Sequence, residues 1–210
     1  MTKNIVIMTR SSKNGGFCVA GIDTRTGEWI RLVSTNSCTG GALSKNDLKY
    51  EDGIMCAPLD IVQVSVIQKQ DSKYQPENYI LDTTKPIYRC GFASIDEVLG
   101  LHPCEVHDFL YGNTRAYALE HEVEEFGFSL VLIEIQNLQI NQIVNYAGKK
   151  KTKATFNYNR YCYSSLSVTD PDFYDVPDNT LYDHAYIVVS LPEHGYPEGC
   201  FYKFVAKIYV

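Results

Sequence analysis

The sequence predicts a mainly β protein built from two small β-barrels, with short helices between them. Short runs rich in Val, Ile, Tyr and Phe recur along the chain, and 14 Gly and 8 Pro supply frequent turns. Of the 210 residues, 45% are apolar and 21% are charged, which excludes a disordered chain and leaves room for one large domain or two small ones. A single β-rich domain is the alternative.

Five strands are expected in the first half of the chain. They are residues 4–9, 17–23, 28–34, 60–67 and 77–82. Gly27 closes the link between the second and third strands, since glycine adopts the positive φ that a hairpin turn needs. The connection 35–58 is long for a segment without structure of its own, and this length favours a functional role.

Helix signals are confined to the middle of the chain. Ser94 and Glu97 fit a capping box, in which each side chain bonds the other residue's backbone amide, and the helix should end near Gly100. A second helical turn is expected over residues 103–109. Residues 113–125 have apolar spacing that fits a helix with acidic residues on its outer side.

Strands return in the second half. They are residues 128–135, 138–146, 154–158, 160–169, 185–191 and 200–210. A basic turn is expected at 149–153 and a hairpin turn at Asn159. Two blocks of strands on either side of the helical stretch predict two domains, residues 1–112 and 113–210.

The charge balance limits the partners. The net charge is −6, and residues 106–210 alone carry 8 basic and 13 acidic side chains. A protein that coats duplex DNA needs a basic surface, because neutralising phosphates drives that binding. Any nucleic-acid role must therefore rest on a local patch.

The location predicted from the sequence is cytoplasmic, without membrane contact. The first residues lack the apolar core of a secretory signal, and no run approaches the roughly 20 apolar residues of a membrane span. The seven cysteines form no CxxC pair, and an odd number without a signal peptide is typical of reduced thiols, most of them small buried hydrophobic residues.

Several short motifs recur in the order of a known family. They are Cys18-Val-Ala-Gly-Ile-Asp23, Gly27-Glu-Trp-Ile-Arg-Leu-Val-Ser34, Leu59-Asp-Ile-Val62, Tyr74-Gln-Pro-Glu-Asn78, Ser167-Val-Thr-Asp-Pro171, Val189-Ser-Leu191 and Tyr202-Lys-Phe-Val-Ala-Lys-Ile208. Together they resemble a bacterial family described as a dual OB-fold domain. The resemblance implies two OB barrels over nearly the whole chain and a role related to nucleic acids or defence. Relatives tend to have Pro where this chain has Leu32.

The strongest local signal is a basic and aromatic stretch. Residues 135–169 contain no acid, and their five cations are interleaved with aromatic side chains. Cations that follow phosphates beside rings that stack on bases are what a single-strand binder needs. The alternative is that the rings form the barrel core and the lysines are a solvated hairpin tip. The residues assigned to this interface are Tyr146, Lys149, Lys150, Lys151, Lys153, Tyr158, Arg160 and Tyr161.

Arg31 is a further candidate, because it lies within a strand near the only Trp. It belongs to a second basic group with Arg10, Lys13 and Arg25. The alternative reading is a structural cation buried against an acid such as Asp60.

Metal and catalytic sites have little support in the sequence. Zinc ligands could come from His102, Cys104, His107 and His121, but their spacing matches no standard site. Asp170 and Asp172, with Asp175, could hold a divalent cation, although Asp-Pro-Asp more often marks a turn. None of the common nucleotide-binding or hydrolase motifs occurs, and we expect no cofactor.

The leading hypothesis is a non-catalytic binding protein for single-stranded nucleic acid or a nucleotide-like ligand. The first alternative is a protein-interaction module that acts beside a helicase, a nuclease or a defence effector. The second is a metal-dependent enzyme that processes nucleotides and uses Asp170.

Overall fold

The computed structural model describes residues 1–36, 39–144 and 148–210. The chain divides into two compact units, Met1–Ser72 with Pro76–Pro103, and Lys73–Gln75 with Cys104–Val210, called unit 1 and unit 2 below. Each is described by itself. The expected division into domains at residue 112 remains a prediction about which parts fold independently.

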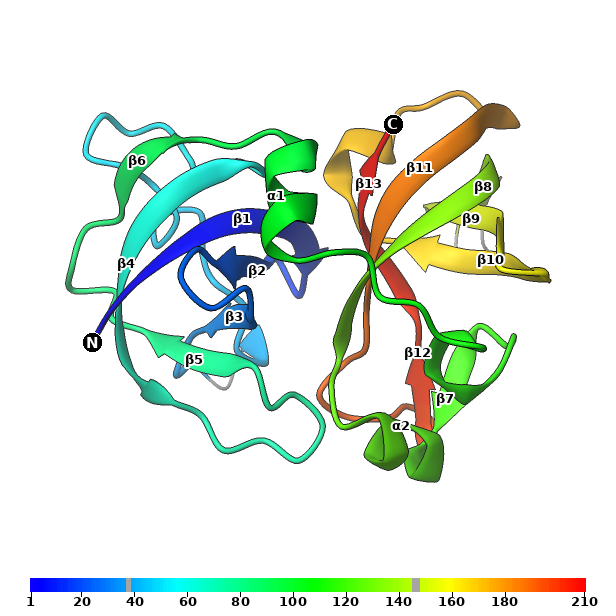
Figure 1. Cartoon of the computed structure of the whole chain (residues 1–210), viewed down its shortest axis with the longest axis horizontal. Coiled ribbons are helices and arrows are strands. Elements are labelled where there is room, and N and C mark those ends of the chain that lie inside the picture. The colour runs from blue at the N-terminus through cyan, green and yellow to red at the C-terminus, as the bar shows by residue number, and fades with distance from the viewer. Residues whose placement is uncertain (37–38, 145–147) are drawn as a thin grey trace. The chain divides into compact units, whose positions relative to one another are not determined.

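Unit 1 is a ring of five strands with a sixth at its edge (Figure 1). The strands are β1 (Thr2–Lys13), β2 (Gly16–Asp23), β3 (Trp29–Val33), β4 (Asp60–Lys69), β5 (Asn78–Leu81) and β6 (Tyr88–Phe92). They follow the order β1-β2-β3-β5-β4, and the pairing of β1 with β4 closes the ring. β3 and β5 are parallel, and β6 pairs with β4.

The hairpin between β2 and β3 forms where the sequence predicts it. Gly27 has a φ of +71°, and its amide donates to the Asp23 carbonyl at 2.9 Å. A side chain at this position would also collide with the Leu101 carbonyl oxygen, which lies 2.5 Å from where a Cβ would sit. Glycine is therefore required here on two grounds.

The long connection between β3 and β4 serves the core of unit 1. Leu43, Leu48 and Cys56 are fully buried, and Leu43 forms a β-bridge with Phe17. The Tyr50 hydroxyl donates to Asp60 Oδ2 at 2.5 Å, and this contact together with burial raises the Tyr50 pKa. The segment therefore has a structural role that its length alone did not indicate.

Helix α1 (Ile95–Leu101) begins with the predicted capping box. The amide of Glu97 donates to Ser94 Oγ at 3.2 Å, and the amide of Ser94 donates to Glu97 Oε2 at 2.7 Å. The two reciprocal bonds satisfy amides that the first turn of a helix leaves unpaired.

Unit 2 contains a closed five-stranded barrel. Its strands are β8 (Leu130–Val144), β9 (Lys150–Tyr158), β10 (Tyr161–Val168), β11 (Thr180–Ser190) and β13 (Phe204–Tyr209). The order around the ring is β10-β13-β11-β8-β9, with β10 and β13 parallel. The prediction of a mainly β protein with two small barrels is confirmed.

The remaining elements of unit 2 are short. They are η2 (Leu110–Gly112), β7 (Tyr117–Leu119), α2 (Glu120–Phe126), η3 (Pro171–Phe173) and β12 (Cys200–Tyr202), and β7 pairs with β12. The predicted helical turn at 103–109 is wrong, because this segment runs along the barrel as an irregular strap. The helix predicted at 113–125 begins only at Glu120. No helix in the described ranges has the length and apolar character to span a bilayer.

Tyrosine side chains build much of the unit 2 core. Phe156 and Tyr163 are fully buried and stack with ring centroids 5.6 Å apart. Tyr158 is also buried, and its hydroxyl accepts from the His107 amide at 2.7 Å and donates to the Glu105 carbonyl at 3.2 Å. The strap thus satisfies the polar ends of core tyrosines, as buried phenols require.

Candidate nucleic-acid interface

The structure separates the predicted basic and aromatic stretch into an inner and an outer side. Along β9, Ala154, Phe156 and Tyr158 are buried, whereas Lys151 is exposed and Lys153 is half-buried. Successive side chains of a strand point to opposite faces, so the rings enter the core while the lysines face outward. Tyr158 is therefore a core residue and presents no ring for stacking. The alternative reading is correct for Phe156, Tyr158 and Tyr163.

The lysines gather where β8 ends and β9 begins. Lys149 and Lys150 are exposed, and Lys150 and Lys151 pair in register with Val144 and Ile143. The sequence predicts a turn at 149–153, but the strand begins at Lys150. Among the described residues, Lys150 and Lys151 form no ion pair. Tyr146 lies outside the described residues.

Lys153 is less accessible than its neighbours. Its ammonium donates to Ser167 Oγ at 2.8 Å. Burial, with a smaller contribution from the charge of Lys151, lowers the pKa of Lys153.

The outer side of β8, β9 and β10 is polar and carries mostly uncharged groups. Amides and hydroxyls dominate it: Gln136, Gln139, Asn141, Thr155, Asn157, Ser164 and Ser167 are half-buried or exposed. The neighbouring carboxylates belong to the β8–β11 side, where Glu134 pairs with His184 at 2.9 Å and Asp178 accepts from the Gln142 amide. β9 and β10 themselves contain no acidic residue, and the carboxylates nearest to them are Glu134, which lines a pocket with Asn157 and Asn159, and Asp108 at the β9–β10 turn.

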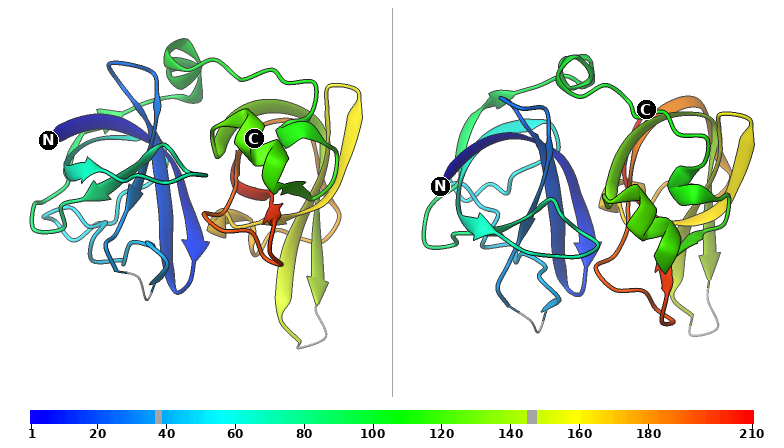
Figure 2. Two further views of the ribbon diagram at one scale, coloured as in Figure 1. Left: turned by 90° about the horizontal axis from the view of Figure 1, so that it is seen from below. Right: turned by 60° about the horizontal axis from the view of Figure 1, so that its bottom comes forward.

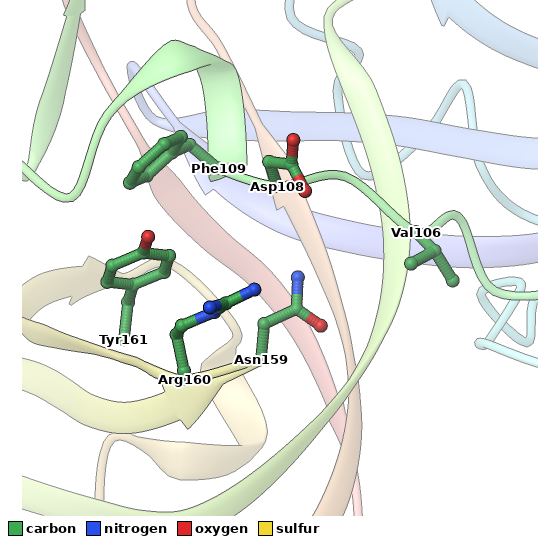
Figure 3. A pocket seen from close by; sticks show the side chains of 6 residues that line it. All are labelled: Val106, Asp108, Phe109, Asn159, Arg160 and Tyr161. Carbon is green, nitrogen blue, oxygen red and sulfur yellow. The ribbon is translucent and has the colours of Figure 1, made fainter.

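A cavity of about 530 Å³ lies at the turn between β9 and β10. Figure 3 shows the six lining residues, Val106, Asp108, Phe109, Asn159, Arg160 and Tyr161. Asn159 takes the left-handed conformation (φ 53°), and its Nδ2 donates to the His107 carbonyl at 2.5 Å. This bond ties the turn to the strap, so the turn predicted at Asn159 also holds one wall of the cavity.

Two side chains of this cavity can recognise a ligand directly. Arg160 is exposed and makes no ion pair or hydrogen bond within the described part of the chain. Tyr161 is half-buried and stacks on Phe109, with centroids 4.6 Å apart and 28° between the ring planes. Phe109 and Asp108 are not among the residues predicted from the sequence, because nothing local indicates that residues 104–109 cross the hairpin turn.

The lysines and Arg160 lie at opposite ends of one hairpin. β9 runs from Lys150 to the turn that leads into β10, and Figure 2 shows it as a long yellow strand. The eight steps from Lys150 to Tyr158, at about 3.3 Å each, make β9 roughly 26 Å long. The cations therefore lie at two separate places along the hairpin, one at each end of β9.

Arg31 is a buried structural cation in this fold. It is 3% exposed and pairs with Glu77 Oε1 at 3.2 Å. The sequence analysis named Asp60 as an example of such a partner, but Asp60 accepts from Tyr50 and from the Ala57 amide. Arg10 of the same basic group donates to the Cys56 carbonyl at 2.5 Å.

The candidate cation site at Asp170 holds an ammonium group. Lys207 pairs with both Asp170, at 3.1 Å, and Asp172. Asp170 Oδ1 also accepts from the Asp172 amide, as a turn-capping residue does, and burial raises the Asp170 pKa. Two of the carboxylates that the enzyme hypothesis needs are therefore already paired with the Lys207 ammonium.

The histidines proposed as zinc ligands have other contacts. His102 Nδ1 lies 2.8 Å from the Gly27 carbonyl oxygen, and the His107 ring packs against Phe126 and Phe128. Within the described ranges, no group of three or more His, Cys, Asp or Glu residues could hold a metal.

The two units share one topology. In each ring the first strand pairs with the second and the fourth, and the third pairs in parallel with the fifth. This arrangement is the five-stranded Greek-key barrel of the OB fold, so the chain is a tandem OB-barrel protein.

The chain belongs to the family of the Dual OB-containing domain (DuOB), whose model matches residues 3–208. The match confirms the resemblance found in the sequence. OB folds commonly bind nucleic acids. No curated protein and no solved structure matches the chain.

Proposed function

We propose that unit 2 binds single-stranded nucleic acid without catalysis, along the outer side of β9 and β10. The observation that carries this proposal is the hairpin of β9 and β10, which contains no acidic residue and has cations at both ends, Lys150 and Lys151 at one and Arg160 at the other. These cations form no ion pair with any residue that the structure describes. The carboxylates on the β8–β11 side would repel a phosphate backbone and direct it across β9 and β10.

The position of these residues in the barrel supports the proposal. β9 and β10 are the second and third strands of an OB barrel, whose outer face binds oligonucleotides in many OB folds. The connection between the first and second strands often takes part, and Lys149, Lys150 and Lys151 stand at the end of that connection.

The chemistry predicts binding dominated by phosphate contacts. The outer side of β9 and β10 offers amides and hydroxyls, while the ring stack of Tyr161 and Phe109 lies only at the turn. Sequence preference should therefore be weak, and affinity should fall steeply with salt, since counterion release drives contacts to phosphate.

The test is the binding of a labelled single-stranded oligonucleotide, followed by fluorescence anisotropy at low salt. The variant Lys150→Ala/Lys151→Ala should bind weakly. The control Lys45→Ala/Lys85→Ala changes the charge equally at exposed lysines of unit 1 and should bind like the wild type. Absence of binding by the wild type, or equal loss in both double variants, would refute the proposal.

A protein-interaction module is the second candidate, because β6 is an edge strand with exposed aromatic side chains. Phe92 is 69% exposed and Tyr88 is 50% exposed. Among the described strands β6 pairs with β4 alone, and such an edge can accept an additional strand from a partner.

The second candidate predicts a protein partner that remains bound after nuclease treatment and is lost in Phe92→Ser. The control is Leu181→Ser, because Leu181 is also 69% exposed but lies in unit 2. Retention of the partner by Phe92→Ser would argue against β6 as the docking edge.

A further inference from the structure

We infer that the cavity at the β9–β10 turn is a subsite for a single nucleotide unit, with its base against the Tyr161–Phe109 stack and its monophosphate on Arg160. The inference rests on the proposed function and deepens it, because it assigns a ligand class to one end of the hairpin.

The aromatic pair supplies the base platform. The two rings come from different elements, Tyr161 from the start of β10 and Phe109 from the strap, and their planes are inclined by only 28°. In Figure 3 the rings lie together on one side of the cavity, and both side chains are half-buried. A base that continues this stack gains contact without ordering new side chains.

Arg160 supplies the anion contact. It is exposed at the turn and lacks an ion-pair partner in the part of the chain that the structure describes. A planar guanidinium can donate two parallel hydrogen bonds to a phosphate. The arginine and the ring stack line the same cavity, so one ligand can reach both.

The opposite wall supplies acceptors for hydrogen-bond donors of the ligand. The carboxylate of Asp108 lines the cavity, and Asn159 keeps its Oδ1 as an acceptor because its Nδ2 is bound to the His107 carbonyl. Exocyclic amino groups and ribose hydroxyls are donors that match these oxygens.

The charges of the lining favour a ligand with a single phosphate. Arg160 is the one cation among the lining residues and Asp108 the one anion, so a single phosphate can pair with the guanidinium, whereas the further charges of a triphosphate would meet only the carboxylate. The volume of about 530 Å³ lies within the usual range of small-ligand sites.

The test is calorimetric titration of the full chain with AMP, with adenosine and inorganic phosphate as separate arms. We expect AMP to bind, and Tyr161→Leu to weaken it by about 5- to 150-fold while Tyr161→Phe retains it. Arg160→Gln should weaken AMP binding by about 10-fold or more and leave adenosine binding nearly unchanged. Inorganic phosphate alone should bind much more weakly than AMP.

The control separates this inference from the proposed function. Lys150→Ala/Lys151→Ala should weaken oligonucleotide binding and retain AMP binding, since the substituted lysines lie at the other end of β9. Failure of the wild type to bind AMP at millimolar concentration, or equal AMP affinity in wild type, Tyr161→Leu and Arg160→Gln, would overturn the inference. If either of these results is found while the oligonucleotide still binds, only the nucleotide subsite is overturned and the proposed function stands. If AMP binds but the oligonucleotide does not, only the proposed function is overturned.

Discussion

The ring of Tyr161 stacks on the ring of Phe109 with centroids 4.6 Å apart, and this contact joins the β9–β10 turn to the strap that crosses it. The pair lines the same cavity as Arg160 and places aromatic surface beside that guanidinium. The other rings of the hairpin, Phe156, Tyr158 and Tyr163, lie in the core. The hairpin therefore contributes rings both to the core and to the cavity at the turn, and mutations should separate the effects on stability from the effects on binding.

The core role predicts a large loss of stability from Phe156→Ala. Phe156 is fully buried and stacks on Tyr163, so the truncation should lower the free energy of unfolding by about 3–5 kcal/mol. Arg160→Ala at the exposed turn should change it by about 0.5 kcal/mol or less. Urea denaturation measures both, and similar values for the two variants would place Phe156 outside the core.

Arg31 should matter for stability through Glu77. Arg31→Met leaves a buried carboxylate without its cation, which typically costs about 3–5 kcal/mol. The double variant Arg31→Met/Glu77→Met removes both charges and should recover most of that loss. Urea denaturation of the three proteins forms the test, and a double variant less stable than the single one would contradict it.

Lys203 should make the stability of the protein depend on pH. Its side chain is 1% exposed and donates to the carbonyl oxygen and to Oδ1 of Asn113, and burial lowers its pKa from 10.5 to about 7. Below pH 7 the lysine is protonated in both the folded and the unfolded protein. Between pH 7 and about 10 only the unfolded protein binds this proton.

The free energy of unfolding should therefore rise with pH over this window, by at most about 1.4 kcal/mol per pH unit from this group. Lys203→Met should abolish that contribution, whereas Lys85→Met at an exposed position should keep it. Denaturation curves at pH 6, 7, 8 and 9 give the comparison. A Lys203→Met profile parallel to the wild type would show that Lys203 does not titrate in this range.

The sequence predicted the fold better than the site. Alternating and apolar runs marked nearly all the barrel strands, and Ser94 with Glu97 marked the start of α1, because these signals are local. Alternation on β9 divides its residues between two faces, but it cannot say which of the two faces is the core. Tyr158 and the lysines were therefore assigned to one surface.

Long-range contacts determine the features of the site that the sequence did not predict. Arg31 finds Glu77 because β3 and β5 are parallel neighbours in the ring, and Phe109 reaches Tyr161 because the strap crosses the hairpin. Neither contact can be predicted from the spacing of residues in the sequence. The same applies to Lys207, which pairs with Asp170 and Asp172 because β13 is the neighbour of β10 in the ring.

The salt dependence of oligonucleotide binding tests the central proposal most directly. If Lys150 and Lys151 each contact a phosphate, the slope of log K against log salt for Lys150→Ala/Lys151→Ala should be shallower than for the wild type by about 1.4, at roughly 0.7 per contact with a single strand. The Lys45→Ala/Lys85→Ala control should keep the wild-type slope. Equal slopes in the wild type and Lys150→Ala/Lys151→Ala would contradict binding along this hairpin.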